Sequence, residues 1–144
     1  MTRALPYLAA ALGGVLGALG RYGLAEALPH RVGTWPWAVL LVNLTGCLVL
    51  GVLVAAVFAR HPDSAWLRPF LGTGVLGGYT TFSTFAVDAV QLTDAGRPGV
   101  AAAYVVASVV GGVLAAACGV VIGRSLPGRT APLGADERAE GGVA

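Results

Sequence analysis

Long apolar runs alternate with short polar segments along most of the chain. The runs cover residues 5–28, 35–59, 66–90 and 100–122, and the connecting segments carry the Pro, Gly and charged residues that end helices. A helix needs about 20 mostly apolar residues to cross a hydrocarbon core about 30 Å thick. The pattern therefore predicts an all-α membrane protein with four transmembrane helices and with both termini on one side of the membrane.

The composition supports this fold class. Hydrophobic residues make up 56% of the 144 residues, charged residues make up 11%, and the mean hydropathy is +0.78. An ordinary soluble domain has about 25% charged residues. We therefore expect one transmembrane domain over residues 1–123 and a disordered tail over residues 124–144, which are rich in Pro, Gly and charge. The first run is too long for the apolar core of a signal peptide, so we expect it to remain in the mature protein.

All nine basic residues are arginines, and their positions bear on orientation. Near the predicted helix ends, five lie on the side of the termini and two on the other side: Arg3, Arg60, Arg68, Arg124 and Arg129 against Arg31 and Arg97. Cytoplasmic segments are enriched in arginine, so this distribution favours cytoplasmic termini in a multi-pass protein of the cell inner membrane. The net charge of only +2 gives no indication of nucleic-acid binding.

A few polar side chains lie inside the predicted spans, where each is costly unless it faces protein or water. Arg21 is either an interfacial anchor or a residue that attracts anions into a vestibule. Asn43 either joins two helices or donates hydrogen bonds into a pore. Tyr104 and Ser108 are four residues apart and share one face of the fourth span, where they either form a packing seam or line a wet path.

Glycines and hydroxyl residues are concentrated in the third span, in the sequence GTGVLGGYTTFSTF at residues 72–85. Glycine costs about 1 kcal/mol relative to alanine in a helix, so we predict a break near the centre of this helix, between Gly77 and Ser83. Such a break exposes backbone carbonyls, which are natural ion ligands, and is tolerated only inside protein or along a cavity. Phe82 and Phe85 can present their electropositive ring edges in one direction, which suits a small anion.

Four features together resemble, in order and spacing, the Fluc/CrcB family of fluoride ion channels: GGVLGALGRY, VNLTG around Asn43, GGYTTFSTF, and Tyr104 with Ser108. The resemblance covers all four predicted spans. It implies an antiparallel, dual-topology homodimer embedded in membrane lipid, in which one subunit is inverted relative to the other. Such a dimer would export fluoride passively through two pores along the interface and lower the fluoride concentration in the cytoplasm.

The resemblance also implies roles for individual residues. The ring edges of Phe82 and Phe85 would contact fluoride. The other pore-lining side chains would be Asn43, Ser83, Thr84, Tyr104 and Ser108. A structural Na⁺ at the dimer centre would be bound by the backbone carbonyls of Gly77 and Thr80 from both subunits. Arg21 matches the arginine of the first-helix motif, at a vestibule or packing position.

Two alternatives follow from the charged residues. The arginine imbalance leaves open that the chain prefers one orientation and pairs with an oppositely oriented partner. A small four-helix proton-coupled multidrug exporter is the alternative function, but it would use a carboxylate within the membrane, and Glu26 and Asp88 lie toward span ends. The sequence shows no cluster of His, Cys and carboxylate residues at one depth, so we do not expect an enzyme.

Overall fold

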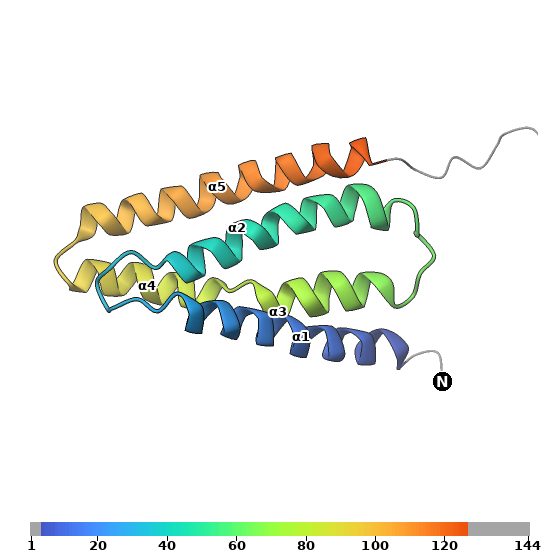
Figure 1. Ribbon diagram of the computed structural model, residues 1–144, viewed down its shortest axis with the longest axis horizontal. Coiled ribbons are helices and arrows are strands. Elements are labelled where there is room, and N and C mark those ends of the chain that lie inside the picture. The colour runs from blue at the N-terminus through green and yellow to red at the C-terminus, as the bar shows by residue number, and fades with distance from the viewer. Residues whose placement is uncertain (1–3, 127–144) are drawn as a thin grey trace, which may run out of the picture.

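The computed structural model describes residues 4–126, and within that range every regular element is a helix. Figure 1 shows the helices lying side by side along their lengths, with the start of α1 and the end of α5 at the same end of the bundle. The elements in chain order are α1 (Leu5–Ala27), α2 (Trp37–Val52), the π-helices η1 (Leu53–Phe58) and η2 (Arg68–Leu76), α3 (Gly77–Tyr79), α4 (Phe82–Asp94) and α5 (Pro98–Ser125). The predicted all-α fold is confirmed.

Three of the helices are long and apolar enough to cross a membrane: Leu5–Ala27, the continuous α2 and η1 from Trp37 to Phe58, and Pro98–Ser125. Their bounds lie within a few residues of the predicted runs. The helix α5 includes Arg124 and Ser125, which we expected to belong to the tail, because nothing in the sequence breaks the helix before Leu126. Residues 127–144 of the predicted tail lie outside the described residues.

The predicted third span is divided among η2, α3 and α4. The helix α3 ends at Tyr79, and Thr80 and Thr81 are extended, with ψ angles of 158° and 123°. The helix α4 then begins at Phe82. Because no single long helix covers this segment, the number of four membrane crossings stays a prediction.

Glycines allow two pairs of helices to approach each other closely. A Cβ atom on Gly17 of α1 would overlap the carbonyl oxygen of Val75 in η2, and one on Gly51 of α2 would overlap the carbonyl oxygen of Ala116 in α5. These contacts place α1 against η2 and α3, and α2 against α5. The junction between α3 and α4 is thereby positioned between α1 and α2.

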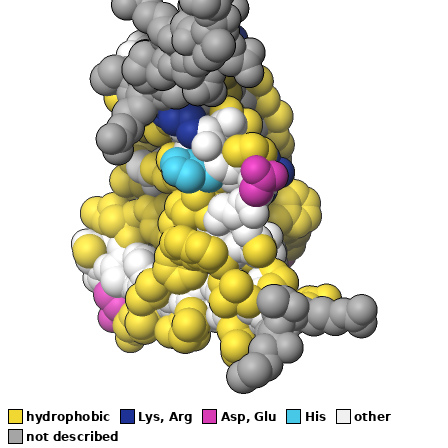
Figure 2. All heavy atoms as spheres, turned by 90° about the vertical axis from the view of Figure 1, so that its right-hand side faces the viewer, with side chains coloured by type: hydrophobic (Ala, Val, Ile, Leu, Met, Phe, Trp, Pro, Cys, Tyr) yellow, Lys and Arg dark blue, Asp and Glu magenta, His cyan; other side chains and the backbone are white. Residues whose placement is uncertain are grey.

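The outer surface of the bundle is largely apolar. Leu8, Leu12, Leu16 and Leu19 of α1 are all exposed. Figure 2 shows one end of the bundle, where hydrophobic side chains cover most of the visible described surface and charged side chains occupy small patches. Such a surface is expected of a protein that faces lipid.

Candidate functional site

The side chain of Asn43 on α2 binds the extended residues between α3 and α4. Its Nδ2 donates a hydrogen bond to the carbonyl oxygen of Thr81 at 3.0 Å, and its Oδ1 accepts one from the backbone N–H of Thr81 at 2.9 Å. A single amide therefore satisfies both backbone groups of a residue that has no helical conformation. The contact joins α2 to the extended segment, and Asn43 also lines a groove, so both interpretations of Asn43 stay predictions.

Thr81 is the N-cap of α4, a role that sequence reasoning did not assign. Its Oγ1 accepts a hydrogen bond from the backbone N–H of Thr84 at 3.2 Å, as N-cap side chains do. The same oxygen lies 3.0 Å from the Oγ1 of Thr84 and 3.3 Å from the Oγ of Ser83. Because Thr81 is buried and the other two are exposed, this small hydroxyl cluster joins the protein interior to its surface.

A groove with a volume of about 450 Å³ opens beside this junction. It brings together most of the residues that we expected to contact ions: Asn43, Gly77, Thr80, Phe82, Phe85 and Ser108. These residues come from α2, α3, α4, α5 and the extended segment, so the arrangement depends on the tertiary fold. Ser83, Thr84 and Tyr104 do not line this groove.

Two phenylalanines lie along the groove at different depths. The ring centroids of Phe82 and Phe85 are 5.8 Å apart, with an angle of 43° between the ring planes. Phe82 is 80% exposed, whereas Phe85 is partly buried, and its ring centroid lies 5.3 Å from that of Tyr104. The aromatic side chains thus lead from the open face of the groove toward the buried hydroxyl of Tyr104.

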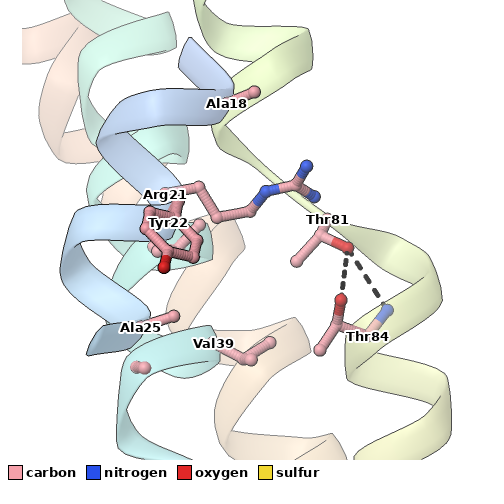
Figure 3. Close-up of a pocket in the computed structure, with 9 residues that line it drawn as sticks. Ala18, Arg21, Tyr22, Ala25, Val39, Thr81 and Thr84 are labelled. Carbon is pink, nitrogen blue, oxygen red and sulfur yellow. Dashed lines mark hydrogen bonds between the residues drawn. The ribbon is translucent and has the colours of Figure 1, made fainter. Parts of the chain in front are cut away.

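Arg21 lies in a second pocket, which shares Thr81 with the groove. This pocket has a volume of about 250 Å³, and Thr81 and Thr84 contribute to its lining together with Arg21 and Tyr22. Figure 3 shows the side chain of Arg21 extending toward Thr81, which hydrogen-bonds to Thr84. A cation is therefore placed beside the hydroxyl cluster. This position agrees with a vestibule, and the partial burial of Arg21 also agrees with packing.

The two residues expected to bind Na⁺ lie at the interruption between α3 and α4. Thr80 follows α3 and precedes the N-cap of α4, so its carbonyl lies outside both helices. The space beside Gly77 is open, because the nearest atom that an added Cβ would meet is the carbonyl oxygen of Gly72 at 3.9 Å. Residues 4–126 contain no group of three or more His, Cys, Asp or Glu side chains that could hold a metal ion.

The fold and the groove define a small helical membrane protein whose polar groups converge at an interruption between two helices, an arrangement typical of channels and transporters. Residues 8–120 match the family model described as CrcB-like protein, Camphor Resistance (CrcB). The chain belongs to this family, as its resemblance to the Fluc/CrcB channels predicted.

Several curated relatives are similar over most of this chain. The fluoride-specific ion channel FluC 2 of Streptomyces avermitilis is 48% identical over 68% of this chain and 62% of its own length. The protein of the same name from Thermobifida fusca is 47% identical over 76% of this chain and 82% of its own length. The fluoride-specific ion channel FluC of Chloroflexus aurantiacus is 44% identical over 81% of this chain and 94% of its own length.

Family membership settles the class and location of the protein. The relatives are named as ion channels, so the chain belongs with transport proteins and not with enzymes. Together with its apolar helices, this makes it a multi-pass protein of the cell membrane.

Proposed function

We propose that this protein is a fluoride-selective channel that allows passive export of fluoride across the cell membrane and lowers its cytoplasmic concentration. The observation that carries the proposal is the groove, where Asn43, Phe82, Phe85 and Ser108 come together from three helices. The names of the relatives, which are fluoride-specific ion channels, support fluoride as the ion.

The chemistry of the groove suits a small, strongly hydrated anion. A pore must replace the water around such an ion with several donors and must still let it leave. Ring edges, hydroxyls and an amide provide partial positive charge without the strong binding of a full cation. Fluoride would pass the edges of Phe82 and Phe85 and then reach the hydroxyls of Tyr104 and Ser108.

The same proposal includes a broken third span, for which Asn43 provides support. Two extended residues at membrane depth would leave unpaired backbone groups, and the Asn43 amide pairs with those of Thr81. The segment from Arg68 to Asp94 runs alongside the three long helices, so it can serve as the fourth crossing in two parts.

The assembly that we propose is an antiparallel homodimer with two pores. Its support is the open face of the groove, where Phe82 is 80% exposed although it belongs to the proposed ion path. A second, inverted subunit would enclose this face. A Na⁺ ion at the dimer centre, bound by the Gly77 and Thr80 carbonyls of both subunits, would supply positive charge to offset their partial negative charges.

Fluoride efflux from proteoliposomes tests the proposal. The single purified chain should release fluoride rapidly to a fluoride-selective electrode and should release chloride far more slowly. Equal release of both ions would refute fluoride selectivity. If the single chain releases no fluoride but gains activity with an oppositely oriented relative, the channel is a heterodimer.

The alternative function, a proton-coupled multidrug exporter, gains one supporting observation from the structure. Asp88 is only 6% exposed and is therefore the type of buried carboxylate that such exporters use. A proton flux that depends on an added organic cation, in liposomes that show no fluoride efflux, would favour the exporter.

A further inference from the structure

Four buried side-chain atoms have no hydrogen-bond partner within the described part of the chain. They are the Nε1 of Trp35, the Oδ2 of Asp88, the hydroxyl of Tyr104 and the Oγ of Ser108. An unpaired buried polar atom typically costs about 1–3 kcal/mol. Several such atoms in one structure call for a functional explanation or for water and ions around them.

The four atoms belong to one region, where the N-terminal end of α2 meets α4 and α5. The Trp35 ring packs edge-on against Tyr104, with centroids 5.7 Å apart and an angle of 80°. The Tyr104 hydroxyl lies near the carboxyl of Asp88 and the hydroxyl of Ser108, and each of these three side chains has an oxygen without a hydrogen-bond partner. Ser108 also lines the groove, so the set of unpaired groups begins at the groove and includes the buried carboxyl of Asp88.

A histidine stands between Asp88 and the surface. The Nε2 of His30, in the connection between α1 and α2, lies 3.5 Å from the Oδ1 of Asp88. The His30 side chain is 27% exposed and the Asp88 side chain is 7% exposed. Among residues 4–126, this is the one contact between a basic and an acidic side chain. Asp88 is therefore in contact with a side chain that reaches solvent.

Few other groups can compensate the charge of Asp88. His30 from the α1–α2 connection and Tyr104 from α5 are the titratable groups that face it, and the described parts of α1 and α2 contribute none. Arg97, at the same end of the bundle, donates to the carbonyl oxygen of Gly33 at 2.9 Å. The net charge beside the Tyr104 hydroxyl therefore depends on the protonation of His30 and of Asp88.

We propose that His30 and Asp88 form a proton-controlled port at the end of the hydroxyl path. When His30 is protonated, the pair has no net charge and an anion can approach Tyr104. When His30 is neutral, the carboxylate repels the anion, and this repulsion is strengthened because the site is largely shielded from water. This inference rests on the proposed fluoride channel function and adds a pH dependence and an entry point to it.

Fluoride efflux at different pH values tests the port. The pH is set equal on both sides, because an inverted dimer would place one port at each face. Efflux should fall roughly fivefold between about pH 5.5 and about pH 8.5, a range over which histidine side chains commonly lose their charge. Protein-free liposomes at each pH provide the background, since protonated fluoride can cross lipid unaided.

Substitutions of similar size separate the two members of the pair. Asp88→Asn should conduct rapidly at every pH, because it removes the negative charge. His30→Gln should conduct slowly at every pH, near the rate that the wild type shows at high pH. The double variant should match Asp88→Asn. His61→Gln is the matched control. His61 is exposed and lies between η1 and η2, outside the α1–α2 connection that holds His30, and its Nδ1 lies 3.1 Å from the carbonyl oxygen of Val57. It should keep the wild-type profile.

The outcomes distinguish the port from the channel itself. A wild-type protein that conducts fluoride equally at all pH values would overturn the port and leave the channel intact. Absence of fluoride efflux at every pH would overturn the proposed function. An Asp88→Asn variant that retains the wild-type profile would also overturn the port. The wild-type profile alone decides the question if a variant does not assemble.

Discussion

The Asn43 amide and the Thr81 backbone form a pair of hydrogen bonds, at 3.0 Å and 2.9 Å, that joins α2 to the extended segment between α3 and α4. This contact determines where α4 begins relative to α2. It therefore determines how Phe82 and Phe85, in the first turn of α4, face the groove. One asparagine thus has both a structural role and a place on the proposed ion path.

Replacing Asn43 by Leu removes both hydrogen bonds and leaves two backbone groups unpaired. We expect a loss of at least about 2 kcal/mol in stability, at about 1–3 kcal/mol for each buried unsatisfied group. Thermal unfolding in detergent, followed by tryptophan fluorescence, measures the loss. Thr93→Val is a suitable control, because the exposed Thr93 hydroxyl bonds only to its own helix, at Ala89. A midpoint equal to that of the control would show that Asn43 does not hold the junction.

The close approach of α1 to η2 and α3 predicts a sharp difference between two glycines of the same helix. Gly17→Ala should destabilise the protein by about 1–3 kcal/mol, because the new methyl group meets backbone atoms of Val75 and Tyr79. Gly23→Ala should be neutral or stabilising by up to about 1 kcal/mol, because nothing lies within 4 Å and alanine favours helix. Thermal unfolding of the two variants side by side tests the packing, and equal effects would contradict it.

The exposed position of Phe82 allows its role in conduction to be separated from stability. Phe82→Ile should leave the unfolding midpoint of the subunit nearly unchanged and should slow fluoride efflux roughly tenfold or more, a barrier increase of about 1.4 kcal/mol. The loss is expected because an aliphatic side chain has no electropositive ring edge. Tyr7→Ile is the matched control, since Tyr7 on α1 is 77% exposed and lies outside the groove. Wild-type efflux in Phe82→Ile would remove Phe82 from the ion path.

The fold class and most helix bounds were predictable from the sequence, because long apolar runs determine helices in a membrane. The role of Thr81 was missed, although the signal was present. Thr81 comes directly before an amphipathic run, and a threonine in that position commonly caps a helix. The break was predicted between Gly77 and Ser83, and the two extended residues, Thr80 and Thr81, lie within that range.

The grouping of His30, Trp35 and Asp88 could not be predicted from the sequence. Asp88 lies near the end of an apolar run, so it was interpreted as close to the membrane boundary. The structure buries it against α5 and beneath the α1–α2 connection, which is more than 50 residues earlier in the chain. Only tertiary packing brings these segments together. The apolar pattern of each helix shows that one face is buried, but not which polar residue of another segment it meets.

The two interpretations of Arg21 make different predictions about salt. If Arg21 attracts fluoride into the pocket that it shares with Thr81 and Thr84, Arg21→Gln should slow efflux roughly fivefold at low ionic strength, the scale of a unit charge in a hydrated site. That difference should shrink as an impermeant salt is added, because salt screens the field that concentrates anions. A packing role predicts instead a lower unfolding midpoint and an efflux ratio that does not change with salt. Arg124→Gln, at the exposed end of α5, controls for general surface charge. We expect the ratio of wild-type to variant efflux to fall as salt increases. A ratio that is independent of salt would exclude the vestibule role.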